Sequence, residues 1–205
     1  MKKECRFCNI LKGNGKYGNI DTPMCVKDKF FALASIGALV PGWTLIIPKE
    51  HVYNMGKFYG DSSFCDFVDE IANVLKLETN ERIVFFEHGA NHCDSLTGCG
   101  TNHAHLHLIP YDKSIVELAS KHKKWIKCNC SDIDSITKGR EYLLCGDYQN
   151  GFSSSDCYVS IVEIPESQFF RKIIANDLGI PEEYDYKTFV NEINSELTTK
   201  YFVAR

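Results

Sequence analysis

The spacing of apolar residues along the chain predicts a mixture of short strands and a few helices. Apolar runs typical of strands occupy residues 24–26, 30–34, 43–47, 82–87, 142–145 and 157–164. Between residues 62 and 78 the apolar positions repeat about every 3.6 residues, which predicts an amphipathic helix that begins at Asp61 or Ser62. Further helices are expected at 115–121, at 167–178 with Ser167 near the N-cap, and at 186–197.

The chain of 205 residues is long enough to bury one good core and to carry an added subdomain. It contains no internal repeat, no low-complexity tract and no clear linker. We therefore expect one compact body, in which residues 112–205 form a C-terminal extension packed on residues 1–111.

Composition and charge narrow the class of protein. The chain is 44% hydrophobic and 24% charged, with a formal net charge of −4, which gives no support for a surface that coats nucleic acid. No apolar run approaches the ~18–20 residues of a membrane span, and no apolar signal-peptide core follows the first lysines. The ten cysteines without such a signal favour reduced thiols and metal ligands over disulfides. A cytoplasmic protein is expected.

Three of the seven histidines, His103, His105 and His107, stand at alternate positions near the middle of the chain. On a β-strand they would line one face at steps of roughly 7 Å, whereas a helix would splay them by about 200° per step. A neutral imidazole can attack phosphorus while its neighbours hold the phosphate oxygens. Alternate histidines on a strand also suit zinc, and the spacing alone weighs the two chemistries equally.

Other polar clusters leave alternatives open. Cys5 and Cys8 form a CxxC that suits a zinc site, a redox pair or neither. The Gly-, Ser- and Asn-rich segment 88–102 is typical of a phosphate-holding loop, and His88 in it is a candidate leaving-group acid. Cys128 and Cys130 fit a second metal site less well than a pair of buried or idle thiols.

The segment 103–109, His-Ala-His-Leu-His-Leu-Ile, resembles the signature of the histidine triad (HIT) family, His-φ-His-φ-His-φ-φ with φ apolar. Two further motifs are similar to those of the family and occur in the same order. They are the CxxC at Cys5–Cys8 and the strand that ends Pro48-Lys49-Glu50-His51. The resemblance covers residues 4–111, so residues 1–111 are interpreted as the HIT domain, with the C-terminal extension outside the common core.

The resemblance implies an α+β fold with an antiparallel sheet, and reaction at the α-phosphate of a nucleotide conjugate. His105 matches the nucleophile and His107 the histidine that contacts the phosphate. In zinc-containing relatives the ligands correspond to Cys5, Cys8, His51 and His103, which implies a structural Zn²⁺. A homodimer is expected by resemblance alone, and the whole resembles a bacterial branch that carries a C-terminal extension.

Departures from the family pattern concern the phosphate and nucleoside contacts. The usual Gln and Ser or Thr before the triad are Cys99 and Gly100 here, and Thr101 is a candidate for the lost leaving-group hydroxyl. A ribose-binding Asp aligns with Ser35. The candidate nucleotide-binding residues are Ser35, Ile36, Glu87, Gly98, Gly100, Gln168 and Arg171, the last as a ligand for a phosphate tail or carboxylate.

The resulting prediction is a nucleotide-conjugate hydrolase or nucleotidyltransferase that works through a nucleotidyl-histidine intermediate. Its substrate would be a dinucleoside polyphosphate, a nucleoside phosphoramidate or a similar molecule. Two alternatives stay open. The first is a phosphorylase or transferase that uses phosphate or a sugar phosphate as acceptor, and the second is a catalytically weak, zinc-stabilised nucleotide-binding module.

Overall fold

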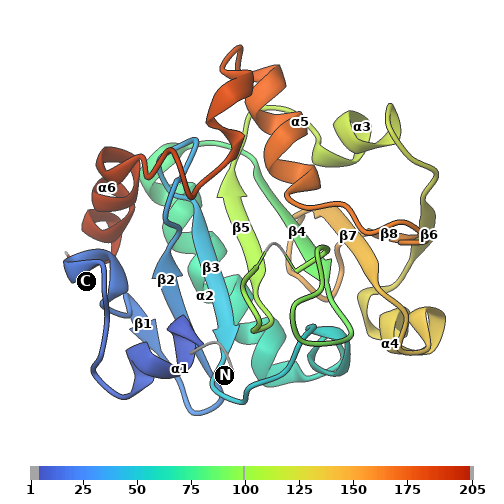
Figure 1. The fold of residues 1–205 in the computed structure, drawn as a ribbon, viewed down its shortest axis with the longest axis horizontal. Coiled ribbons are helices and arrows are strands. Elements are labelled where there is room, and N and C mark those ends of the chain that lie inside the picture. The colour runs from blue at the N-terminus through green and yellow to red at the C-terminus, as the bar shows by residue number, and fades with distance from the viewer. Residues whose placement is uncertain (1–4, 99, 204–205) are drawn as a thin grey trace.

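A single eight-stranded sheet organises the molecule, and every pair of neighbouring strands in it is antiparallel (Figure 1). The computed structural model describes residues 5–98 and 100–203. The strands follow the order β1-β2-β3-β5-β4-β7-β8-β6 across the sheet. Their bounds are β1 (Cys25–Val26), β2 (Phe30–Ala34), β3 (Thr44–Pro48), β4 (Ile83–Gly89), β5 (Leu106–Pro110), β6 (Ile126–Cys128), β7 (Tyr142–Asp147) and β8 (Cys157–Ile161).

One face of the sheet packs on the long helix α2 (Ser62–Thr79), which lies behind the strands in Figure 1. The helix begins where the Asp61 side chain accepts a hydrogen bond from Ser63 N, and it ends at Asn80 in the left-handed conformation. The predicted 3.6-residue stripe is the buried face, with Phe64, Val68, Ile71 and Leu75 in the core.

The opposite face of the sheet is covered by short helices from the N-terminus, the middle and the C-terminal part of the chain. They include α1 (Arg6–Leu11), α3 (Ile115–Ser120) and α5 (Phe169–Asp177), which share a second hydrophobic cluster with β2, β3, β4 and β7. The remaining elements are α4 (Ile133–Thr137), α6 (Glu192–Val203), and the 3-10 turns Gly18–Asp21, Gly56–Phe58, Cys130–Asp132 and Pro181–Tyr184. This arrangement is the expected α+β fold.

Residues after 111 continue the sheet. Strand β7 pairs with β4 over six residue pairs, and β8 and β6 follow it outward. The division into residues 1–111 and 112–205 stays a prediction from the sequence.

Two expectations about elements are wrong, and a third is shifted slightly. Strand β5 begins at Leu106, so only His107 of the histidine row lies within it. Helix α5 begins at Phe169, two residues after the predicted start, with Gln168, the neighbour of Ser167, as a left-handed N-cap. The last helix, α6, begins at Glu192, while the preceding residues 185–191 form an irregular segment that we call the C-terminal strap.

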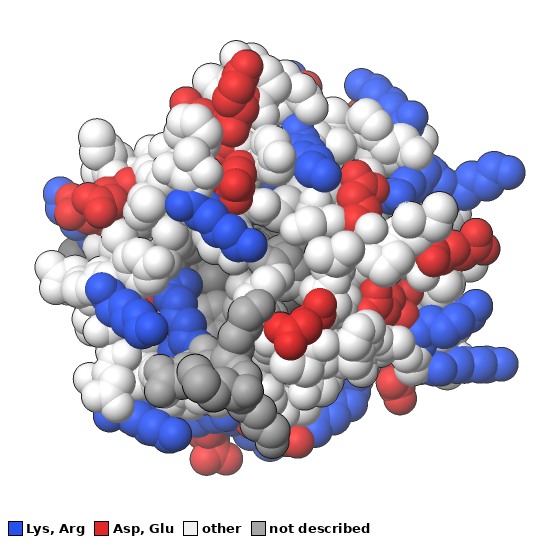
Figure 2. Space-filling view, in the orientation of Figure 1, with Lys and Arg blue, Asp and Glu red and all other residues white. Residues whose placement is uncertain are grey.

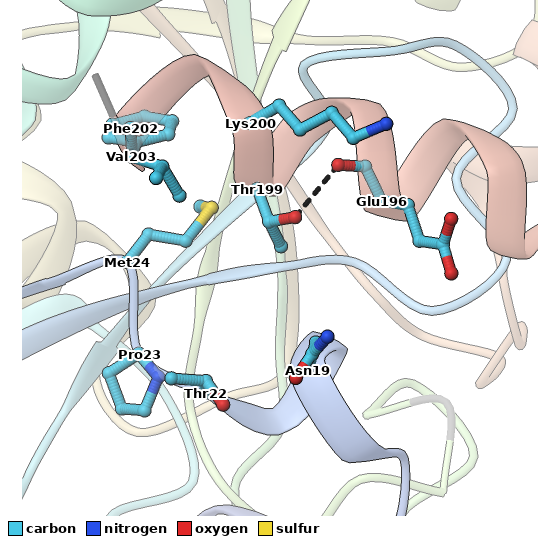
Figure 3. Close-up of a pocket in the computed structure, with 9 residues that line it drawn as sticks. All are labelled: Asn19, Thr22, Pro23, Met24, Glu196, Thr199, Lys200, Phe202 and Val203. Atoms are coloured by element: carbon cyan, nitrogen blue, oxygen red, sulfur yellow. Dashed lines mark hydrogen bonds between the residues drawn. The ribbon is translucent and has the colours of Figure 1, made fainter.

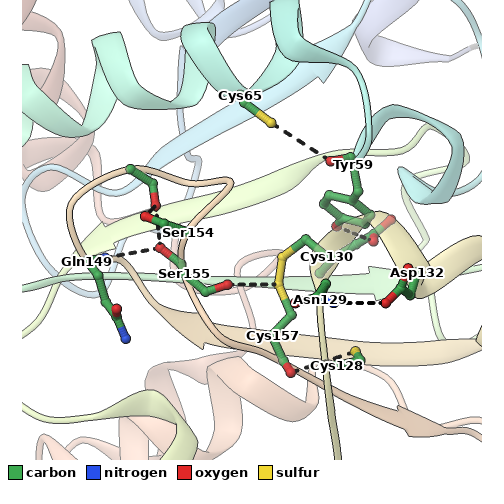
Figure 4. The surroundings of a disulfide bond; sticks show 12 residues. Tyr59, Cys65, Cys128, Asn129, Cys130, Asp132, Gln149, Ser154, Ser155 and Cys157 are labelled. Atoms are coloured by element: carbon green, nitrogen blue, oxygen red, sulfur yellow. Dashed lines mark hydrogen bonds between the residues drawn. A yellow bond between two sulfur atoms is a disulfide. The ribbon is translucent and has the colours of Figure 1, made fainter.

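The cysteine expectation also needs a correction. Cys130 and Cys157 form a disulfide that ties the turn before α4 to β8, and Cys128 lies beside them with its thiol directed to the Cys157 carbonyl (Figure 4). The pair is buried. The prediction that cysteines stay reduced is therefore wrong for these two, because the β6–β8 pairing brings distant parts of the chain together.

Figure 2 shows acidic and basic side chains interspersed over the face seen in Figure 1. In residues 5–98 and 100–203, no helix has both the length and the apolar character needed to cross a membrane.

Candidate functional site

The candidate site lies where β4 and β5 run side by side on the face that α2 does not cover. His107 pairs with Leu45 of β3 and Phe86 of β4, and its ring stacks on that of Phe86 with 4.4 Å between centroids. A small cavity of about 40 Å³ opens beside it. The cavity is lined by Arg6, Phe7, Ser35, Ile36, Leu45, His88, Thr101, His105, His107, Arg171 and Tyr186.

His105 is positioned as a nucleophile. Its Nδ1 lies 2.9 Å from the carbonyl oxygen of His103, and a carbonyl only accepts, so Nδ1 carries the proton. The lone pair is then on Nε2. Burial lowers the pKa of this imidazole to about 4, so it is neutral at physiological pH. A neutral ring with a free Nε2 lone pair, next to a cavity, can attack an electrophilic phosphorus.

His107 has the opposite arrangement of proton and lone pair. The indole Nε1–H of Trp43 donates to Nδ1 of His107 over 2.9 Å, so the proton of the ring is on Nε2. Both side chains are buried, and burial holds the pKa of His107 well below its usual range. His107 is thereby a neutral N–H donor next to His105, with 4.7 Å between the ring centroids. Such a donor suits a non-bridging phosphate oxygen.

Sequence reasoning did not assign a role to Trp43, which it placed only at the start of a strand. The motif contained no sign of the contact, because Trp43 and His107 are 64 residues apart and meet only through the β3–β5 pairing. An aromatic N–H donor at the start of the strand that pairs with the triad was the available signal.

His103 turns away from the cavity towards the N-terminal helix. Its Nδ1 lies 3.2 Å from Cys5 Sγ and 3.6 Å from Cys8 Sγ, and Cys8 Sγ is 3.3 Å from Nδ1 of His51. The four ligand atoms lie within 4.8 Å of one another. Three motifs separated by about half the chain therefore meet at one point, as the resemblance implied.

The donor set fits zinc. Tetrahedral Zn²⁺ with bonds of about 2.3 Å to sulfur and 2.0 Å to nitrogen spaces its S and N ligands roughly 3.5 Å apart, which matches the separations here. Nε2 of His103 lies 2.8 Å from the carbonyl of Pro48, so this nitrogen carries the proton and leaves Nδ1 for a metal. Burial lowers the pKa of His103 to about 4, which keeps it in the neutral, ligating form.

The remaining candidates divide into two groups. Ser35, Ile36, His88, Thr101 and Arg171 line the cavity. Burial lowers the pKa of His88 to about 3, and its Nε2 faces the backbone N–H of Phe170 at 3.5 Å. With so low a pKa the ring is not in its protonated form at neutral pH, so it is a poor proton donor to a leaving group, although it lines the cavity.

The other candidates lie outside the cavity wall. Glu87 points to the α2 face of the sheet, where Met55 N, Tyr59 and Tyr142 donate to its carboxylate. Gln168 binds Asp185 of the strap, and Gly98 and Gly100 lie in the loop that precedes Thr101. Cys99 falls outside the described residues. Sequence reasoning missed four lining residues: Arg6, Phe7, Leu45 and Tyr186.

The C-terminal strap forms part of the cavity wall through Tyr186. Gly37 N donates to Val190 O over 2.6 Å, and Gly37 has a positive φ of 67°. A Cβ at this position would lie 2.6 Å from Cβ of Tyr186, so only glycine permits this close approach. The strap is joined to the loop after β2.

A larger hollow of about 490 Å³ lies elsewhere, between the segment around Pro23 and helix α6 (Figure 3). Its lining is mainly apolar or hydroxylic, with Glu196 and Lys200 as the charged side chains. It contains no histidine or cysteine, so the histidine cavity is the better candidate for a catalytic site.

Comparison with known proteins agrees with this site. No family model matches the chain. A curated relative, adenosine 5′-monophosphoramidase HINT3 of Danio rerio, is 26% identical over 148 residues, which cover 70% of this chain and 89% of the relative. The chain is thus similar to this relative over most of its length, and it carries the triad and the Cys/His group described above.

Two solved structures with histidine triad names are similar to this chain, one over about half of it and one over nearly all of it. A HIT family protein from Bacillus anthracis is 26% identical, with a TM-score of 0.45, and the match covers 55% of this chain and 77% of the other. A hypothetical histidine triad nucleotide-binding protein from Sulfolobus tokodaii is 15% identical, with a TM-score of 0.38, over 97% of this chain and 91% of the other.

Proposed function

We propose that this protein is an enzyme that cleaves nucleotide conjugates at the α-phosphate, with His105 as the nucleophile. The observation that carries the proposal is the pair of opposite tautomers at the cavity. His105 presents a lone pair on Nε2, and His107 presents an N–H on Nε2. A relative named as an adenosine 5′-monophosphoramidase supports the reaction class.

In the first step, the Nε2 lone pair of His105 forms a bond to the α-phosphorus, and the bond from phosphorus to the leaving group breaks. The leaving group departs with that electron pair and takes a proton where its basicity requires one; the Thr101 hydroxyl lines the cavity as the candidate donor. In the second step, a water or another acceptor attacks phosphorus and releases its proton to solvent, while the P–N bond breaks and its electron pair returns to Nε2 of His105. His107 N–H stabilises the charge on the phosphate oxygens throughout.

Zn²⁺ held by Cys5, Cys8, His51 and His103 would be structural, because four protein ligands leave no open position. The ion would fix His103, whose carbonyl in turn holds the proton of His105 in place. The bound ion would therefore help to orient the ring of His105 through the backbone of His103.

The substrate needs more room than the cavity of about 40 Å³ provides, since pockets for ligands of this size measure roughly 300–1,000 Å³. The strap is held to the loop after β2 by the Gly37–Val190 bond. The proposal includes a movement of this strap that opens the site. Loss of hydrogen-exchange protection at Gly37 on nucleotide binding tests it, and unchanged protection would contradict it.

Homodimerisation and a cytoplasmic location remain predictions drawn from the family resemblance and the composition.

A panel of nucleotide conjugates tests the function. The panel contains adenosine 5′-phosphoramidate, dinucleoside polyphosphates and nucleoside diphosphate sugars with each base, each incubated with and without inorganic phosphate. Release of nucleoside monophosphate identifies a hydrolase, and phosphate-dependent release of nucleoside diphosphate identifies a phosphorylase. Absence of turnover across the panel, with nucleotide binding that survives His105→Ala, would overturn the proposal in favour of a binding module.

A further inference from the structure

Three of the cysteines meet where β6 and β8 pair at the edge of the sheet, on the face that packs against α2. Cys128 is the last residue of β6, Cys130 begins the 3-10 turn after it, and Cys157 is the first residue of β8. The register of the two strands places Cys128 directly opposite Cys157. Cys157 therefore has two cysteine neighbours, its disulfide partner Cys130 and its cross-strand partner Cys128.

The bonded pair is shut off from solvent, whereas the third cysteine is not. Cys130 is 4% exposed and Cys157 is 0% exposed, within the hydrophobic cluster that also contains Tyr59 and Phe152. Cys128 is a half-buried free thiol, and its Sγ lies 3.7 Å from the carbonyl oxygen of Cys157 (Figure 4). A dissolved thiol must reach a sulfur to react with it, so Cys128 is the member of the group that is open to small molecules.

The strand pairing brings Cys128 within reach of the disulfide. Directly opposite residues of an antiparallel pair have Cβ atoms about 4.5–5.5 Å apart, and a disulfide joins Cβ atoms about 3.5–4.5 Å apart. Rotation of the Cys128 side chain and a small shift of β6 would let its sulfur bond to that of Cys157. Strand β6 is three residues long and is the end strand of the sheet, so little packing opposes such a shift.

We propose that Cys128, Cys130 and Cys157 form a thiol–disulfide exchange site for small thiols and disulfides of the glutathione class, with Cys128 as the sulfur that reacts with them. In the first step, the thiolate of Cys128 attacks Sγ of Cys157 and a new S–S bond forms. The bond from Cys157 to Cys130 breaks, and its electron pair goes to Cys130 Sγ, which takes up the proton that Cys128 lost. The disulfide thereby moves to the half-buried pair without net oxidation or reduction.

A small thiol then completes the reduction. Its thiolate attacks Sγ of Cys128, which forms a mixed disulfide and releases Cys157 as a thiolate that takes up a proton. A second thiolate attacks the sulfur of the bound small molecule, so a small disulfide departs and Cys128 regains its thiol. Overall, two small thiols give two electrons and two protons to Cys130 and Cys157. A small disulfide that reacts at Cys128 drives the same steps in reverse.

The low acidity of Cys128 makes this exchange slow at neutral pH. Burial and the nearby carboxylate of Asp132 raise the pKa of the Cys128 thiol to about 11, so only a small fraction is thiolate. Attack from within the protein compensates in part, because a neighbouring group acts at an effective concentration far above that of a dissolved thiol. The disulfide therefore opens through Cys128 faster than through direct attack on the buried pair.

Opening the disulfide would free the turn before α4 from β8. That turn and α4 pack on the segment 56–60, where a Cβ on Gly60 would lie 3.9 Å from Cβ of Ser131 and one on Gly56 would lie 3.4 Å from Oδ1 of Asp134. The exchange site would thus control how firmly α4 is held against this segment. Hydrogen-exchange protection of residues 131–137 should fall when the wild-type protein is reduced, and unchanged protection would contradict this consequence.

Reduction followed by peptide mapping tests the proposal. The protein is treated with oxidised glutathione, then with reduced glutathione, and samples blocked with an alkylating reagent are mapped for the Cys130–Cys157 bond. We expect Cys128→Ser to slow loss of this bond at least about tenfold, because direct attack on buried sulfurs is the remaining route. Cys25→Ser removes another half-buried thiol, on β1, and as the matched control should leave the rate unchanged. Equal rates in wild type and Cys128→Ser, or no Cys130–Cys157 bond after oxidation, would overturn the proposal.

A second variant tests the exchange step by itself. In Cys130→Ser, Cys157 loses its buried partner, so treatment with oxidised glutathione should produce a Cys128–Cys157 disulfide in most molecules. The intermediate in this variant is a mixed disulfide on Cys128, from which attack by Cys157 displaces the small thiol. A mixed disulfide that stays on Cys128, with Cys157 still open to alkylation after unfolding, would overturn the exchange step.

Discussion

The two faces of the central sheet both bury polar side chains, but they satisfy them differently. On the α2 face, Glu87 accepts hydrogen bonds of 2.6 Å each from Met55 N, Tyr59 and Tyr142. On the opposite face, His105 and His107 each form a hydrogen bond to the protein with Nδ1, and their rings line a cavity with Nε2 available. The first arrangement is closed, and the second is available to a ligand.

The neighbouring residues Glu87 and His88 show the difference within one strand. Both are buried, and the alternation of β4 sends them to opposite faces. Burial raises the pKa of Glu87 to about 7 and lowers that of His88 to about 3. A strongly shifted pKa marks burial on both faces, so the shift alone does not identify a reacting group. A lone pair or proton that faces a cavity is what identifies a reacting group.

The largest expected effect is the loss of activity on changing the nucleophile. His105→Asn should lower kcat/KM by at least about 10³-fold, because no nitrogen lone pair remains to attack phosphorus. Thermal unfolding should stay within about 2 °C of wild type. His122→Asn, at an exposed histidine outside the site, is the control. Activity retained in His105→Asn would contradict the role of His105 as nucleophile, and with it the claim that only the cavity face carries reactive groups.

The Cys/His group beside the site should stabilise the folded protein when it binds zinc. Cys8→Ser or prolonged chelation should abolish binding of about one equivalent of zinc and lower the free energy of unfolding by about 3 kcal/mol, as for loss of a ligand present at about 100 times its Kd. Elemental analysis and thermal melts measure both quantities. Cys93→Ser, at an exposed cysteine, is the control. Zinc content equal to wild type in Cys8→Ser would refute the ligand set.

The closed cluster on the α2 face should affect stability and leave catalysis unchanged. Because the folded pKa of Glu87 is raised above its usual 4.5 to about 7, its protonated form favours the folded state. Its contribution is present below about pH 4.5 and is lost as the pH rises to 7, by about 3 kcal/mol. Glu87→Gln should flatten this decline in urea unfolding, relative to Glu81→Gln at the surface.

The smallest effect is expected at the residue that orients His107. Trp43→Phe removes the N–H that donates to Nδ1, so His107 can adopt the other tautomer and lose its donor on Nε2. We expect kcat to fall about 10–100-fold with little change in KM, which corresponds to roughly 1.4–2.7 kcal/mol. Trp125→Phe, at a tryptophan outside the cavity wall, should leave kcat unchanged. Equal effects from both would indicate a packing role.

The sequence alone predicted most of the strands, helix α2 and the meeting of the cysteines with His51 and His103. These follow from local periodicity and from motifs that resemble the HIT family. The strand that carries the triad was predicted too long, because Ala104 N donates to Val52 O and the chain leaves the ladder before Leu106. Residues 186–191 of the strap were predicted as helix but are irregular, because tertiary contacts with the loop after β2 override local preference.

Contacts between distant segments that no motif marks could not be predicted. The Trp43–His107 bond and the Cys130–Cys157 disulfide depend on strand order and register, and the Arg6–Asp21 pair joins α1 to the 3-10 turn Gly18–Asp21. Glu87 was expected to bind the nucleotide by resemblance to the family, and the alternation of β4 directs its side chain to the other face of the sheet.

A quenched reaction analysed by intact mass tests the central claim most directly. Wild-type protein mixed with a cleaved conjugate and stopped within one turnover should gain the mass of one nucleoside monophosphate, and peptide mapping should place the adduct on His105. The His105→Asn protein should gain none. A wild-type protein that turns over the conjugate without any adduct, or an adduct on another residue, would contradict the account.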